Sequence, residues 1–142
     1  MATRSTAESM PRLTVNVDGG ARGNPGPAAI GVVVRDADGA IVEAVGETIG
    51  PATNNVAEYR ALLRGVELAA AHGATELELI GDSELVVRQV EGRYKVKNAG
   101  MKELHAQAKA ALADFDDWSI RHVKRAENAD ADRLVNEALD NA

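Results

Sequence analysis

The sequence predicts an α/β fold in which a mixed β-sheet carries helices on both faces. Three strand-like segments come first and contain a hairpin, and strands then alternate with helices. A hairpin joins antiparallel strands, whereas strands separated by helices pair in parallel, so the sheet combines both directions. The 142 residues and 45% hydrophobic content suffice for one core and suit a single domain better than two.

The first three strands are expected at residues 13–17, 28–35 and 40–49. Residues 13–17 (LTVNV) alternate apolar and polar side chains, as half-buried strands do. Residues 36–39 (DADG) have the composition of a hairpin turn between the second and third strands.

Helices and strands alternate through the rest of the chain. Hydrophobic periodicity predicts a helix at residues 56–72, ended by Gly73, followed by a strand at 76–80 and a helix at about 83–91. A basic, glycine-bounded connection at 92–100 precedes a helix at 101–113, a strand at 118–123 and a last helix at 130–139.

Composition limits the chemistry and the location of the protein. The chain has no cysteine, which excludes disulfides, thiolate nucleophiles and cysteine-based metal sites, and which is typical of a reducing compartment. Residues 1–11 lack the apolar core of a secretory signal, so we expect a disordered tail before one domain at 12–142, in the cytoplasm. The net charge of −6 argues against non-specific adhesion to nucleic acid but allows a focused, cation-binding site.

Four acidic residues have ordinary structural explanations when each is considered alone. Asp18 suits an Asp-Gly-Gly turn, and Asn55 with Glu58 has the spacing of a helix capping box. Asp82 is a candidate helix N-cap, and Asp132 suits the first turn of a helix, where the dipole favours acidic groups.

Hydrophobic periodicity predicts that two of these carboxylates face the sheet. Glu58 shares a helical stripe with Leu62 and Val66, and Asp132 shares one with Val135. An inward-facing carboxylate needs hydrogen bonds or a cation, because burying it unpaired costs on the order of several kcal/mol.

Asp18 and Asp82 each follow an apolar strand at its carboxyl end, where open sheets place their ligand sites. Four carboxylates converging from two strands and two helices would form an oxygen-rich site, which favours Mg²⁺ or Mn²⁺ over Zn²⁺. Two such ions about 4 Å apart can activate water and stabilise the leaving oxygen in phosphodiester cleavage.

Four ordered segments give the chain a resemblance to the type 1 ribonuclease H family. They are DGGARGNPGP at residues 18–27, TNNVAE at 53–58, GDS at 81–83 and HVKRAENADADRL at 122–134. The resemblance covers about residues 13–139. It implies the ribonuclease H-like fold, with a five-stranded mixed sheet of strand order 3-2-1-4-5.

The resemblance also implies an endoribonuclease that hydrolyses the RNA strand of RNA/DNA hybrids and leaves 5′-phosphate and 3′-hydroxyl ends. Family members use two Mg²⁺ or Mn²⁺ ions. The matching catalytic, metal-binding residues here are Asp18, Glu58, Asp82 and Asp132, with Gly19 also at the metal site.

Family positions that bind the hybrid are matched as well. Asn24, Asn54 and Asn55 match contacts to the minor groove, where amides meet 2′-hydroxyls and base edges with little sequence preference. Thr53 matches a contact to a DNA phosphate, although its position also suits a helix cap.

The chain departs from the best-known bacterial members in two places. The segment before Asp132 is too short for their flexible histidine loop, which leaves His122, Arg125 and Glu127 as candidate auxiliary residues, with His122 structural by default. Residues 92–100 are too short for their basic helix and loop. Either they are a solvated connection, or they form a reduced substrate-binding element through Arg93, Lys95 and Lys97.

Two alternatives remain open beside the hybrid-specific nuclease. One is a nuclease of the same fold that also acts on double-stranded RNA, and the other is a hybrid-binding module without catalysis. The presence of all four carboxylates argues against the second. We expect a monomer that needs no protein partner and does not bind membranes.

Overall fold

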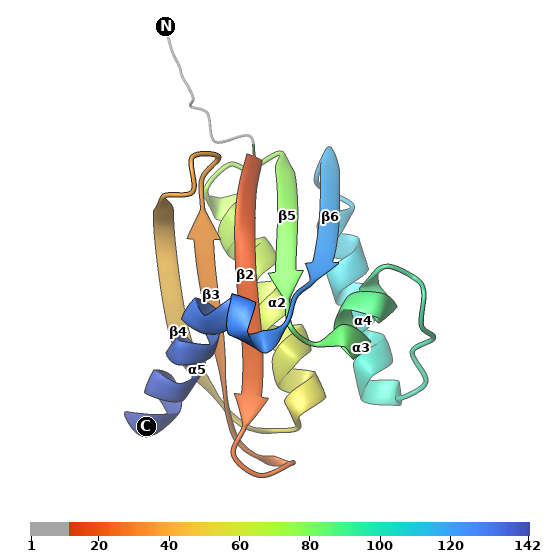
Figure 1. The fold of residues 1–142 in the computed structure, drawn as a ribbon. Coiled ribbons are helices and arrows are strands. Elements are labelled where there is room, and N and C mark those ends of the chain that lie inside the picture. Colours follow the sequence, from red (N-terminus) through yellow and green to blue (C-terminus); the bar gives the residue numbers. More distant parts are fainter. Residues whose placement is uncertain (1–11) are drawn as a thin grey trace, which may run out of the picture.

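Five strands form one mixed sheet in the computed structural model, which describes residues 12–142 (Figure 1). They are β2 (Arg12–Ala21), β3 (Gly26–Arg35), β4 (Ile41–Ala52), β5 (Glu76–Gly81) and β6 (Asp117–His122). Their spatial order is β4-β3-β2-β5-β6, which confirms the predicted order 3-2-1-4-5. The tail expected at residues 1–11 lies outside the described residues.

Helices cover both faces of the sheet, as predicted. Figure 1 shows α2 (Asn54–Ala71), α3 (Glu84–Val90) and α4 (Ala99–Leu112) on one face. The 3₁₀ helix η1 (Arg125–Asn128) and α5 (Ala129–Asp140) lie on the other face, where α5 packs on β2, β3 and β4. None of the helices within residues 12–142 is long and apolar enough to cross a membrane.

The hydrophobic core lies mainly between the sheet and α2, α3 and α4. Val15 and Val17 of β2 meet Leu62 and other buried side chains of α2. Gly65 permits this close packing, because a Cβ there would lie 2.8 Å from Cγ1 of Val17. The tight contact fixes α2 against β2, and each of these two elements carries a predicted site residue.

Strand β2 continues beyond residue 17, where it was expected to end. The additional residues pair with one neighbouring strand only. Residues 18–21 pair with residues 28–31 of β3, whereas the parallel pairing with β5 ends at Val17 and Gly81. The alternative explanation of Asp18 as a turn residue is therefore wrong. Asp18 lies within a strand, at the point where β5 separates from it.

The capping roles considered for Asn55, Glu58 and Asp82 are also wrong. The N-cap of α2 is Thr53, whose hydroxyl accepts a hydrogen bond from the Val56 N–H at 3.2 Å, so Asn55 is already helical. The N-cap of α3 is Ser83. Glu58 and Asp82 are thus available for other interactions, whereas Asp132 does lie in the first turn of α5.

Candidate active site

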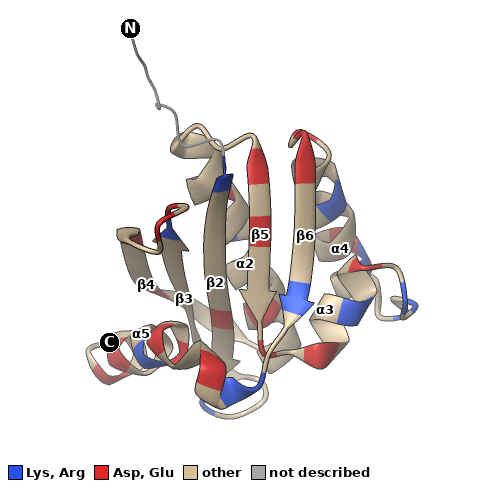
Figure 2. Ribbon diagram, turned by 45° about the horizontal axis from the view of Figure 1, so that its top comes forward, with Lys and Arg blue, Asp and Glu red and all other residues tan. Residues whose placement is uncertain are grey.

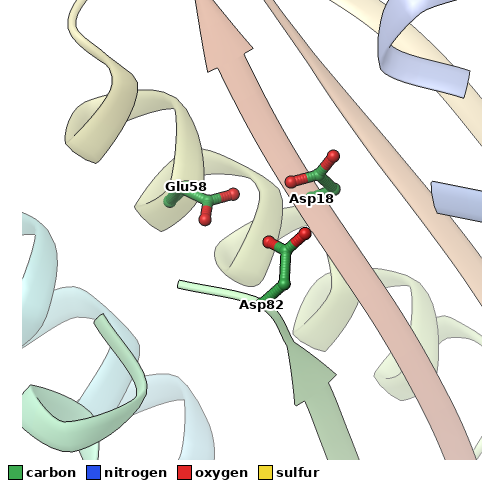
Figure 3. Close-up of side chains that lie close together, drawn as sticks. All are labelled: Asp18, Glu58 and Asp82. Atoms are coloured by element: carbon green, nitrogen blue, oxygen red, sulfur yellow. The ribbon is translucent and has the colours of Figure 1, made fainter. Parts of the chain in front are cut away.

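Asp18, Glu58 and Asp82 form a compact carboxylate cluster. One oxygen of each lies within 4.8 Å of the others, and Figure 3 shows the three side chains directed towards one another. The parallel pairing of β2 and β5 ends at Val17 and Gly81, so the next residue of each strand emerges at the same edge. The strand register therefore brings Asp18 beside Asp82.

Glu58 reaches this edge from α2. Its Oε1 accepts a hydrogen bond from the backbone N–H of Gly19, the residue that follows Asp18. The helix side chain is therefore fixed directly to the strand that carries the first carboxylate.

Burial and mutual repulsion oppose ionisation of the cluster. Burial raises the pKa of Asp18 to about 10, and the charges of Glu58 and Asp82 add to this effect. Burial also raises the pKa of Glu58 to about 7, although the Gly19 N–H acts in the opposite direction. A divalent cation would relieve this penalty, and a donor set made only of carboxylate oxygens fits Mg²⁺ or Mn²⁺.

Asp132 lies in the same cleft but outside the compact cluster. It lines a cleft of about 480 Å³ together with the three other carboxylates. Its Oδ1 accepts a hydrogen bond from the guanidinium of Arg125 at 3.1 Å. Arg125 also lines this cleft and is largely exposed, so a cation faces the acidic site.

Two of the asparagines predicted to bind substrate use their side-chain oxygens to hold backbone segments together beside the cleft. Asn24 Oδ1 accepts from the backbone N–H of Asn54 at 3.0 Å, and Asn54 Oδ1 accepts from that of Ala21 at 2.9 Å. Both NH₂ groups are then free of these bracing bonds. Asn54 and Asn55 line the cleft, and Thr53 caps the helix beside them.

The remaining predicted residues lie apart from the residues that line the cleft. Arg93, Lys95 and Lys97 are exposed in the connection between α3 and α4, where Figure 2 shows basic segments. His122 is the last residue of β6. Glu127 Oε1 accepts from the backbone N–H of Lys124 at 3.3 Å, so its carboxylate caps η1.

Sequence reasoning missed polar residues that surround the site. Arg22 lines the cleft and pairs with Asp140 at 2.7 Å. Asn16 and Asn128 are buried and hydrogen-bonded to each other across 112 positions of sequence. Arg22 stands inside the first recognised motif, which could have drawn attention to it. The asparagine pair has no local signal.

Comparison with known proteins assigns most of the chain to one family. A family described as reverse transcriptase-like matches residues 16–138. Ribonuclease HI of Halobacterium salinarum is 50% identical over 131 residues, which are 92% of this chain and 66% of that protein. A bifunctional protein of Mycobacterium tuberculosis is 48% identical over 132 residues, which are 36% of its length. The chain thus spans less than two thirds of these relatives.

Solved structures agree with this assignment. The crystal structure of the Halobacterium salinarum RNase H1 superposes with a TM-score of 0.90 and covers 92% of this chain and 99% of that one. LC11-RNase H1, isolated from compost by a metagenomic approach, is 44% identical, with a TM-score of 0.87. Its structure is in complex with an RNA/DNA hybrid and covers 91% of this chain and 97% of that one.

Proposed function

Because this chain belongs to the type 1 ribonuclease H family, in a form without the basic helix and loop of other members, we propose that it is an endoribonuclease acting on RNA/DNA hybrids. It hydrolyses the RNA strand and leaves 5′-phosphate and 3′-hydroxyl ends. The observation that carries this proposal is the carboxylate cluster of Asp18, Glu58 and Asp82 in an open cleft.

The metal-binding residues in this proposal are the three clustered carboxylates and Asp132. The raised pKa of Asp18 supports it, since burial of like charges at one point is what a divalent cation would offset. When bound, two Mg²⁺ or Mn²⁺ ions would activate a water molecule and stabilise the leaving oxygen. Gly19 contributes by fixing Glu58 through its backbone N–H.

The asparagines beside the cleft would recognise the minor groove of the hybrid. The oxygens of Asn24 and Asn54 are used within the protein, which leaves their NH₂ groups to donate to 2′-hydroxyls and base acceptors. Asn55 lines the cleft, and Thr53, the N-cap of the same helix, would contact a phosphate of the DNA strand. The 2′-hydroxyl is the feature that separates the cleaved strand from DNA.

Arg125 is the best placed of the three auxiliary candidates. Glu127 is used to cap η1 and His122 ends β6, whereas Arg125 lines the cleft and pairs with Asp132. Its guanidinium can exchange Asp132 for a phosphate oxygen of the substrate or product, because both are acceptors of comparable geometry.

Strand-labelled RNA/DNA, RNA/RNA and DNA/DNA duplexes, each with Mg²⁺, Mn²⁺ or EDTA, test the proposal. We expect cleavage of RNA in the hybrid alone and none in EDTA. Cleavage of RNA/RNA as well would broaden the substrate class, and hybrid binding without cleavage would indicate a binding module. Asp18→Asn should abolish cleavage and preserve hybrid binding, and full activity in that variant would refute the metal assignment.

A further inference from the structure

Two buried asparagines join η1 to β2 behind the carboxylates. Among the described residues, Asn16 is 9% exposed and Asn128 is 1% exposed. Asn16 Nδ2 donates to Asn128 Oδ1 at 3.0 Å, and Asn128 Nδ2 donates to the backbone carbonyl of Val17 at 2.9 Å. Val17 precedes Asp18, and Asp132 follows Asn128 by four residues. These bonds therefore tie the segment carrying one carboxylate to the strand carrying another.

Arg35 determines how both amides are oriented. Its guanidinium donates to Asn16 Oδ1 at 3.1 Å and to Asp130 Oδ2 at 2.7 Å. Arginine has only donors, so Asn16 must turn its oxygen to Arg35 and its NH₂ group to Asn128. Asn128 must then turn its own NH₂ group to the Val17 carbonyl. All the donors point one way, from Arg35 on β3 to the residue before Asp18.

The connection that carries Arg125 is held at both of its ends. At the first end, Val123 N–H donates to the Gly81 carbonyl at 3.0 Å, directly before Asp82. At the second end, Asn128 is bonded to Val17, directly before Asp18. Figure 1 shows this connection crossing from β6 past β5 to β2.

Asn128 also occupies the N-cap position of α5, where an asparagine oxygen ordinarily accepts a hydrogen bond from the helix. Here that oxygen accepts from Asn16. The side chain thus serves the attachment to the sheet instead of capping the helix.

We propose that Arg35, Asn16 and Asn128 are positioning residues, whose directional hydrogen bonds hold η1 on β2 and thereby place Arg125 and Asp132 opposite Asp18. The kinetic consequence rests on the proposed function, but the attachment of η1 does not. Supporting residues of this kind matter because a displacement of about 1 Å in a catalytic group can cost about 100-fold in rate.

Two variants break the chain of hydrogen bonds at different points. Asn16→Asp keeps the acceptor for Arg35 but has no donor for Asn128, and Arg35→Met removes the donor that orients both amides. Arg12→Met is the matched control. Arg12 lies on the same face of β2 as Asn16, and like Arg35 it forms an ion pair, with Glu76 at 3.6 Å. All three variants make the net charge more negative by one.

The variants are compared by steady-state cleavage of the hybrid and by hydrogen exchange of backbone amides. In Asn16→Asp and Arg35→Met we expect kcat to fall about tenfold, with KM changed less than about twofold. Exchange at residues 124–130 should accelerate about tenfold in both, with α2 unaffected. Arg12→Met should match the unaltered protein in both measurements.

Unchanged kcat, or unchanged exchange at residues 124–130, in both variants would overturn the proposal. Exchange that accelerates equally in α2 would also overturn it, since that result indicates a general loss of stability. If Asn16→Asp does not fold, Arg35→Met decides, because Arg35 lies at the partly exposed end of the chain of bonds. If the unaltered protein fails to cleave hybrid, the proposed function fails and hydrogen exchange alone decides whether η1 is held as proposed.

Discussion

Glu58 of α2 accepts a hydrogen bond from the backbone N–H of Gly19, the residue next to Asp18. The contact depends on a very close approach between helix and strand. A Cβ on Gly19 would lie 2.2 Å from the Ala57 carbonyl oxygen, so no larger residue fits there without moving α2. Gly19 therefore sets the distance between two metal-binding candidates.

Gly19→Ala should separate Glu58 from Asp18. We expect a loss of about 1–3 kcal/mol in the free energy of unfolding, since backbone atoms cannot relax as side chains do. Hybrid cleavage should fall about 100-fold in kcat/KM, because the two carboxylates move apart. Urea unfolding and steady-state kinetics measure the two effects.

Gly20→Ala is the control for that substitution. A Cβ on Gly20 would meet Cγ1 of Val135 at 3.7 Å, an ordinary contact. Its stability should change by less than about 1 kcal/mol. Equal losses in the two variants would refute the role of the close approach at Gly19.

Without metal, the protein should lose stability as the pH rises. The pKa of Glu58 is raised to about 7 and that of Asp18 to about 10, so the folded protein keeps protons that the unfolded chain has released. Each group therefore lowers the free energy of unfolding across the window between its ordinary pKa and its raised one, by at most about 1.4 kcal/mol per pH unit. Thermal melting in EDTA from pH 5 to pH 9 measures this slope.

Asp18→Asn should flatten the slope, because it removes the group with the larger rise in pKa. Excess Mg²⁺ should flatten it for the unaltered protein, since binding to the folded state offsets the repulsion. A melting temperature in EDTA that rises with pH would contradict the assignment of buried, mutually repelling carboxylates.

The residue patterns predicted a mixed sheet with helices on both faces, because a hairpin joins antiparallel strands and strands separated by helices pair in parallel. The strand order came from the resemblance to the ribonuclease H family. The sequence also predicted that Asp18 and Asp82 would meet, since each directly follows an apolar stretch and these two stretches pair in parallel. The helix caps could not be predicted in the same way. Thr53, Asn54 and Asn55 are all residue types that cap helices, so the local sequence does not decide among them, and the structure has the cap at Thr53.

The remaining parts of the site depend on contacts between distant segments. The extension of β2 through residues 18–21 requires β3 as a partner and contradicts the local turn signal of Asp-Gly-Gly. The pairing of Asn16 with Asn128 spans 112 positions, and each asparagine alone is an ordinary polar residue. No spacing rule connects such residues before the fold is known.

Two replacements of Asn24 should distinguish its structural hydrogen bond to Asn54 from recognition of the hybrid. Asn24→Asp keeps the oxygen that accepts from the Asn54 N–H but loses the NH₂ donor. We expect KM for the hybrid to rise about tenfold while the free energy of unfolding changes by less than about 0.5 kcal/mol. Asn24→Ala loses both functions and should reduce stability as well. A rise in KM for Asn24→Asp but not for Asn24→Ala would indicate charge repulsion instead of a lost donor.

Arg125→Ala should lower kcat more than it raises KM. Arg125 pairs with Asp132 and faces the acidic cleft, so its loss removes both that ion pair and a positive charge from the cleft wall. We expect a decrease of about tenfold in single-turnover rate, with partial recovery in Arg125→Lys.

Arg133→Ala is a suitable control for the Arg125 variants. Arg133 forms similar ion pairs on α5, with Asp130 at 3.2 Å and Glu137 at 3.6 Å. Exposed pairs of this kind contribute little to stability, so its kinetics should be unchanged. Equal effects of the two substitutions would mean that Arg125 acts only through the general charge of the surface.

The short connection between α3 and α4 should contribute to hybrid binding only through electrostatic attraction between its lysines and phosphates of the hybrid. Lys95 and Lys97 are exposed there, whereas Arg93 is partly neutralised by Glu91 at 3.6 Å. If each lysine contacts one phosphate, Lys95→Gln combined with Lys97→Gln should lower the slope of log K against log salt by about 2. Arg12→Gln, at the opposite end of β2 from Asp18, should leave the slope unchanged. Fluorescence anisotropy of a labelled hybrid in EDTA measures binding without cleavage, and an unaltered slope in the double variant would identify the segment as a solvated connection.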